Sequence, residues 1–201
     1  KNITISTSER TQDYLAFIDE RLESKDDIPD NIEAISYIPE LFFQYHQNET
    51  GWKWMKYIIS KIDQTHAMSN LTGNNGNYPE VSYVLISNIV ENLLGVQPDA
   101  ANNKITTLSH LPNDINELGA SNITIGSSII NLEQIGQKQT KFKYKNGQSP
   151  LIWEARFSGT YEYLYINGKK TASAQGIDFG KIYSYVSVTL NPNQDVLIST
   201  Y

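Results

Sequence analysis

Apolar residues in the first half of the chain recur at helical spacing. Four segments show this pattern and are predicted as helices, at residues 8–23, 31–47, 50–63 and 79–95. Ser8 is the expected N-cap of the first helix, and Gly95 is the expected end of the last. The first and third helices are amphipathic, whereas the second and fourth have little polar face and are expected to be mostly buried. Pro39 removes a backbone donor inside the second segment, which predicts a kink or a late start there.

Beyond Pro98 the pattern changes to alternation of apolar and polar residues, which is typical of strands. The turn signals Asn146-Gly147, Asn167-Gly168 and Asn191-Pro192-Asn193 separate these segments at hairpin spacing. The sequence thus predicts an α+β protein, with a helical-hairpin segment at residues 1–100 and an antiparallel β-sandwich domain at residues 101–201. The predicted strands are residues 105–108, 123–125, 129–135, 140–144, 151–157, 161–166, 183–190 and 196–199.

The order of the helices carries further information, because amphipathic and mostly apolar helices alternate. If neighbours are antiparallel, the two apolar helices run parallel and place Glu33 and Glu80 at the same end. That order fits a partial (α/α) toroid of helical hairpins, in which inner helices are apolar and outer helices keep a polar stripe. A small helical bundle is equally consistent with the pattern.

Composition excludes several functions. The net charge of -6 disfavours nucleic acid as a partner, and no apolar run is long enough for a membrane span. The chain has no cysteine, and His46, His66 and His110 lack ligand spacing, so neither a metal centre nor another cofactor is expected. The chain starts at Lys1 without a signal-peptide pattern, so we expect an upstream segment. The absence of cysteine leaves the cellular compartment open, and the bacterial periplasm and the extracellular space are both compatible with it.

Three stretches of the helical half resemble a known family. Residues 77–83 read NYPEVSY and residues 89–100 read IVENLLGVQPDA, while residues 31–40 read NIEAISYIPE. The first two are similar to the last inner helix of six-hairpin glycosidases, most of all the alpha-L-rhamnosidase-related branch, and the third is similar to an inner helix one hairpin earlier. In that branch the final toroid helix is followed directly by a C-terminal β-domain. Residues 163–169 and 186–192 resemble strands of that domain. The resemblance implies a carbohydrate substrate and a partner region of further helices upstream in the same protein.

Glycoside hydrolysis needs one carboxylic acid that protonates the leaving oxygen and one carboxylate that activates water or attacks the sugar. Glu80 is the candidate for the general base, because it follows a loop rich in Gly and Asn at a helix N-terminus. Glu33 has the same position on the neighbouring apolar helix and could bind a sugar hydroxyl or serve as an acid. Acids at such positions also commonly stabilise the helix dipole, which is the alternative for both.

Polar and aromatic residues beside these acids are candidates for substrate binding. They are Tyr78, Asn77, Asn75 and Asn31. Trp52, Trp54 and Trp153 are expected in the core rather than on a sugar. Lys141, Lys143 and Lys145 share one face of a strand, which indicates a solvated or edge-protecting face.

The sequence therefore favours the C-terminal portion of a glycoside hydrolase that cleaves plant or host glycans with inversion. On its own, such a fragment is expected to be inactive. The alternative is a non-catalytic module that binds carbohydrate or has a structural role. Acids clustered with aromatics at the helix N-termini would favour the enzyme, whereas aromatics along a β-face would favour binding.

Overall fold

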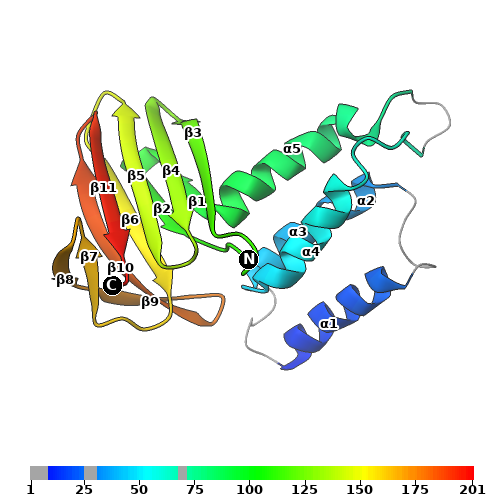
Figure 1. Ribbon diagram of the computed structural model, residues 1–201, viewed down its shortest axis with the longest axis horizontal. Coiled ribbons are helices and arrows are strands. Elements are labelled where there is room, and N and C mark those ends of the chain that lie inside the picture. Colours follow the sequence, from blue (N-terminus) through cyan, green and yellow to red (C-terminus); the bar gives the residue numbers. More distant parts are fainter. Residues whose placement is uncertain (1–8, 25–30, 68–71) are drawn as a thin grey trace. The chain divides into compact units, whose positions relative to one another are not determined.

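The computed structural model describes residues 9–24, 31–67 and 72–201 (Figure 1). The chain divides into two compact units, a helical unit that extends to Ile89 and a β-unit that begins at Val90. The protein thus has a mixed α+β fold, as the sequence predicted. Ser8, the expected N-cap, lies outside the described residues. No helix in the described ranges is long and apolar enough to cross a membrane.

The helical unit consists of short helices that follow the predicted segments. They are α1 (Glu9–Glu23), α2 (Glu33–Ser36), α3 (Ile38–Gln44), α4 (Asn48–Ile59), the 3-10 turn η1 (Asn75–Asn77) and α5 (Pro79–Ser87). Pro39 lies in the first turn of α3, so the predicted second helix is broken at this proline into α2 and α3. Within the unit, α3 and α5 run in the same direction and α4 runs against both (Figure 1).

One hydrophobic core holds this unit together. Its buried members include Leu15, Ile35, Phe42, Trp54, Ile58 and Val81, which come from five helices. The indole Nε1 of Trp54 donates a hydrogen bond to Asp19 Oδ1 at 2.7 Å, which joins α4 to α1. The tryptophan is therefore a core residue, as expected.

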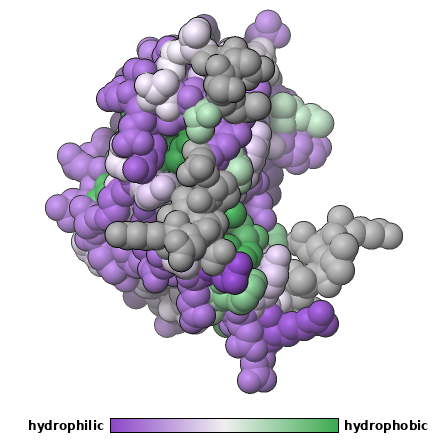
Figure 2. Space-filling model, turned by 90° about the vertical axis from the view of Figure 1, so that its right-hand side faces the viewer, coloured by the Kyte–Doolittle hydropathy of each residue, from purple (hydrophilic) through white to green (hydrophobic). Residues whose placement is uncertain are grey.

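Several apolar side chains of the helical unit stay exposed. Tyr14 and Phe17, which the helical pattern places on the apolar stripe of α1, are 60% and 54% exposed. On α5, Tyr83 and Ile86 are 69% and 58% exposed, although the sequence predicts this helix as mostly buried. On the face that Figure 2 draws, hydrophobic residues, in green, lie among hydrophilic residues, in purple.

After α5 the helix continues as a π-helical turn, η2 (Asn88–Leu93). The sequence instead predicts one regular helix as far as Gly95. Gly95 ends the turn with a φ of 67°. A Cβ atom at this position would lie 1.7 Å from the Leu108 carbonyl oxygen, so only glycine fits. The predicted stop at Gly95 is confirmed.

The β-unit contains eleven strands in the part of the chain that the structure describes. They are β1 (Val96–Asp99), β2 (Lys104–Leu108), β3 (Glu117–Ile125), β4 (Ser128–Ile135), β5 (Gln139–Asn146), β6 (Leu151–Ser158), β7 (Tyr163–Ile166), β8 (Lys169–Ala172), β9 (Ala174–Asp178), β10 (Lys181–Leu190) and β11 (Gln194–Ser199). All eight predicted strands are present, and β1, β8 and β9 are additional. These three short strands are mostly exposed and lack the apolar alternation by which strands are recognised.

The strands form two sheets. The five-stranded sheet has the order β1-β2-β6-β10-β9, and the six-stranded sheet has the order β3-β4-β5-β11-β7-β8. Neighbouring strands are antiparallel except β2 and β6, which pair in parallel with Ile105 opposite Trp153. The prediction of an antiparallel domain is thus wrong for this pair, because the pairing joins segments about fifty residues apart and no local turn signal reports it.

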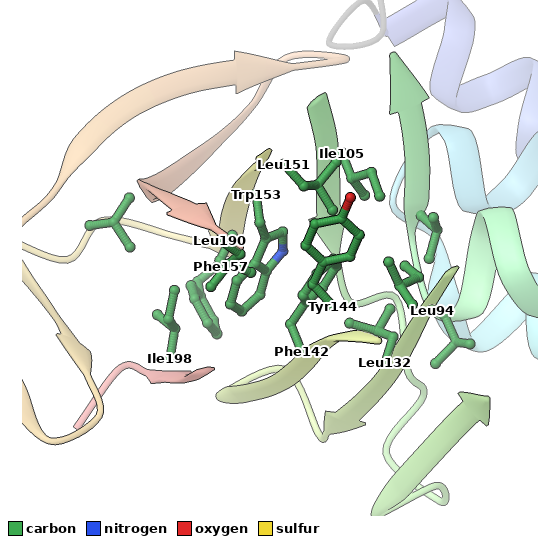
Figure 3. Close-up of a cluster of buried hydrophobic side chains, with 14 of the residues drawn as sticks. Leu94, Ile105, Leu132, Phe142, Tyr144, Leu151, Trp153, Phe157, Leu190 and Ile198 are labelled. Atoms are coloured by element: carbon green, nitrogen blue, oxygen red, sulfur yellow. The ribbon is translucent and has the colours of Figure 1, made fainter. Parts of the chain in front are cut away.

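The two sheets share one core, which gives a sandwich-like arrangement (Figure 3). At its centre the rings of Phe142 on β5 and Trp153 on β6 stack with centroids 4.6 Å apart. The Trp153 indole also donates to Thr107 Oγ1 at 3.0 Å, so its only polar atom is satisfied inside the core.

Two of the three predicted hairpin turns have a different role. Asn167-Gly168 closes the hairpin of β7 and β8 as predicted. Asn146-Gly147 and Asn191-Pro192-Asn193 instead carry the chain from one sheet to the other, because the strands on either side of each turn belong to different sheets. Turn residues identify the reversal of the chain, whereas the sheet that the next strand joins depends on its long-range partners.

Candidate functional site

Glu33 is the first residue of α2, and Asn31, two residues earlier, positions it. Asn31 Oδ1 accepts a hydrogen bond from the Glu33 backbone N–H at 3.0 Å, and Asn31 Nδ2 donates to Glu33 Oε2 at 3.3 Å. The asparagine thus satisfies a backbone donor at the helix start and one carboxylate oxygen at the same time. Glu33 keeps 24% of its side chain exposed and can be reached from solvent.

His66 occupies the other oxygen of this carboxylate. Its Nε2 lies 2.9 Å from Glu33 Oε1, and its side chain is completely buried. The backbone N–H of His66 donates to the Gly73 carbonyl, and Thr65 pairs with Asn74 in an antiparallel bridge. These contacts hold the histidine at the base of the loop that leads to α5.

Tyr78 packs on the second side of His66. The two ring centroids are 4.0 Å apart with an interplanar angle of 40°. Tyr78 precedes α5 in an extended conformation, and its hydroxyl donates to the Thr72 carbonyl at 2.8 Å. The start of α5 and the start of α2 are therefore linked through one histidine.

The electrostatics of the site favour an ionised Glu33. The hydrogen bond from His66 is the largest cause that lowers the pKa of this carboxyl below its ordinary value of 4.5, followed by the hydrogen bond from Asn31. Partial burial acts in the opposite direction but does not overcome them. The site thus favours the negatively charged form of the Glu33 carboxylate, which accepts hydrogen bonds.

The remaining predicted residues lie nearby on the chain but differ in their surroundings. Glu80 is exposed in the first turn of α5, and its carboxylate forms no hydrogen bond or ion pair within the described residues. Asn77 is exposed. Asn75 is buried, and its Nδ2 donates to the Lys61 carbonyl at 2.9 Å, so it braces the loop.

The structure thus brings Glu33, Asn31 and Tyr78 together, and it adds His66, for which the sequence pattern indicates no role. The histidine is 33 residues from Glu33, so no local spacing reports their contact. The Gly- and Asn-rich loop that follows His66 and leads to α5 is the one local signal that this histidine lies near α5. No group of three or more His, Asp or Glu residues that could hold a metal ion occurs in the described ranges.

Comparison of the sequence with protein-family models and with curated proteins gave no match. The site itself therefore carries the argument for function, together with the resemblance of the helical segments. What the site defines is a partly exposed, charged carboxylate held by a buried histidine beside a tyrosine ring.

Proposed function

We propose that this chain is the C-terminal portion of a glycoside hydrolase that cleaves plant or host glycans with inversion at the anomeric carbon. The observation that carries the proposal is the ionised Glu33 carboxylate, held by His66 beside the Tyr78 ring at the start of α5. Carboxylates accept hydrogen bonds from sugar hydroxyls, and a partly exposed tyrosine ring offers an apolar surface to a pyranose.

The two acids are suited to different tasks. Because the pKa of Glu33 is lowered, this residue suits the binding of a sugar hydroxyl rather than proton donation. Glu80 is the proposed general base: its carboxylate is exposed and could orient the attacking water. The general acid then comes from the upstream helical region, which is why the 201-residue chain alone is expected to be inactive.

The partners of the two acids fill supporting roles in this proposal. Tyr78 and Asn77 face the sugar from the loop before α5, and Asn31 binds it from the start of α2. Asn75, whose amide is bound to a backbone carbonyl, supports the loop from inside. The site is thus built mainly from two helix starts that the fold of the helical unit brings to one end.

The arrangement of the helices supports a segment of a larger helical toroid. Helices α3 and α5 run parallel within the unit, as inner helices of successive hairpins would (Figure 1). The exposed Tyr83 and Ile86 on α5, with Tyr14 and Phe17 on α1, offer apolar surfaces on which further helices of the same protein can pack.

The experiment uses the protein with its upstream helices and compares the wild type with Glu80→Gln. Loss of a positioned general base lowers kcat by about 100-fold to 10,000-fold. Loss of a helix-dipole interaction alone costs about 0.3–1 kcal/mol of stability and leaves kcat nearly unchanged. The measurements are kcat on aryl glycosides and the thermal midpoint, with azide added as an external nucleophile.

Glu40→Gln is the matched control, because Glu40 is likewise an exposed acid in the first turn of a helix, α3. We expect this variant to keep its kcat. Near-normal turnover of Glu80→Gln would remove Glu80 from catalysis. No hydrolysis of any glycoside by the extended protein would overturn the proposed function itself.

A further inference from the structure

A groove of about 740 Å³ lies on the six-stranded sheet of the β-unit, over β3, β4, β5 and β11. The sheet makes room for it at β3. Gly119, opposite Glu133 on β4, contributes no side chain, and the pairing of β3 with β4 shifts register between Ala120 and Ile123. Asn122, inside this bulge, adopts a left-handed backbone with a φ of 60°. The hollow is thus built into the strand pairing.

The floor of the groove carries charged side chains at the outward-facing positions of its strands. Lys143 on β5 lies opposite Asn131 on β4 and opposite Asp195 on β11. Lys143 and Asp195 are exposed, and neither forms an ion pair with any residue that the structure describes. One register step further along, Lys141 pairs with Glu133 at 2.8 Å. Lys143, Asp195 and Asn131 thus form one row across the sheet, which presents an ammonium, a carboxylate and an amide.

The walls of the groove are held by hydrogen bonds. The backbone N–H of Asn122 donates to Asn131 Oδ1 at 2.9 Å, and Lys145 Nζ donates to Asn122 Oδ1 at 2.7 Å. At the opposite wall, Asn167 Oδ1 accepts from the Leu197 N–H at 2.9 Å. These bonds fix the asparagine side chains at both walls before any ligand binds, which lowers the part of the ordering cost that these side chains contribute.

The composition of the lining selects the ligand. Three carboxylates, Glu117, Glu133 and Asp195, face two ammonium groups, Lys141 and Lys143, so the groove has no excess of positive charge. Nucleic acid and other polyanions are therefore disfavoured. Closely spaced donors and acceptors of both kinds instead match vicinal hydroxyl groups, which donate and accept at once.

A second hollow of about 470 Å³ adjoins the groove. It shares Asn167, Asp195 and Val196 with it and extends toward the end of β10. The polar surface therefore continues past Asp195 and offers a path for a chain of several linked rings rather than for one small molecule.

We propose that this groove binds a neutral oligosaccharide, with Lys143 and Asp195 as its principal contacts. The proposal concerns the β-unit and does not rest on the helical site or on catalysis. It also revises the interpretation of the lysine face: the residues are solvated as expected, but β5 lies between β4 and β11, so they protect no sheet edge.

The test screens the purified 201-residue chain on an array of neutral and uronic-acid-containing oligosaccharides. Calorimetry with the best neutral oligosaccharide then compares the wild type with Lys143→Ala and Asp195→Ala. Loss of one charged hydrogen-bond partner is expected to weaken binding about tenfold or more for each variant. Both residues are exposed, so the variants should keep the wild-type melting temperature.

Lys169→Ala and Glu162→Ala are the matched controls, because they remove an exposed lysine and an exposed acid elsewhere on the β-unit. They should bind as the wild type does. Glu33→Gln should also bind normally, which separates the groove from the helical site. Absence of neutral glycan binding, preference for uronic-acid glycans, or equal losses in the control variants would overturn the proposal.

Discussion

His66 Nε2 lies 2.9 Å from Glu33 Oε1 across 33 residues of sequence. The contact couples a buried imidazole to a carboxylate that solvent reaches. Tyr78 covers the imidazole from the direction of α5. The strength of this contact therefore reports whether the two helix starts are held together as a unit.

We expect a double-mutant cycle of Glu33→Ala and His66→Ala to give a coupling energy of about 0.5–3 kcal/mol, because the histidine is fully buried. Glu40 and Gln44, joined by an exposed hydrogen bond of 2.9 Å within α3, form the control pair, for which about 0.2–0.5 kcal/mol is expected. Urea unfolding at neutral pH measures both. Equal coupling in the two pairs would mean that the buried contact has no special strength.

The lowered pKa of Glu33 predicts a pH dependence of stability. Its folded-state pKa lies below its ordinary value of 4.5, so the folded state favours the ionised form. The resulting stabilisation is fully present above the ordinary value and is lost as the pH falls through the folded-state pKa. We therefore expect the difference in free energy of unfolding between wild type and Glu33→Gln, measured with urea, to shrink as the pH falls from about 7 to about 3. A constant difference would contradict the shift.

The stack of Phe142 on Trp153 predicts a large effect of truncation in the sandwich core. Both rings are fully buried, so Phe142→Ala should lower the free energy of unfolding by about 3–5 kcal/mol. The neighbouring Lys143→Ala changes an exposed side chain of the same strand and should stay within about 0.5 kcal/mol of the wild type. Denaturant unfolding followed by circular dichroism compares them. Similar losses in both variants would show that the core does not depend on this ring.

Alanine substitutions at Gly95 and Gly136 distinguish the stability cost of backbone strain from that of a steric clash. Both have positive φ, but a Cβ at Gly136 meets nothing within 4 Å, whereas one at Gly95 overlaps the Leu108 carbonyl. Gly136→Ala should therefore cost about 1–2 kcal/mol, the cost of a left-handed alanine. Gly95→Ala should cost more, because η2 and β2 must also move apart. Thermal unfolding of the two variants tests the order, and a reversed order would refute it.

Much of the local structure follows from periodicity and turn chemistry. The four predicted helices and eight predicted strands are found, and the break at Pro39 and the stop at Gly95 have the physical reasons that were expected. The parallel pairing of β2 with β6 has no such local signal. Likewise, Tyr14 and Phe17 have helical spacing, but spacing alone does not say whether a neighbour covers them.

The candidate site was predictable only in part. The alternation of helix types placed Glu33 near the start of α5, and the structure links Glu33 to Tyr78 at that point. The role of His66 could not be predicted, because its contacts depend on how the loop before α5 folds back. The same holds for Asn75, whose amide binds a backbone carbonyl 14 residues earlier.

The position of β11 affects how the protein is made. This strand is the last of the six-stranded sheet along the chain, yet it lies between β5 and β7. Until β11 is in place, β5 and β7 each have one unpaired backbone edge, and such edges can recruit strands of other chains. The sheet closes only when residues 194–199 leave the exit tunnel. A chain that lacks residues 194–199 should therefore aggregate more readily than the 201-residue chain.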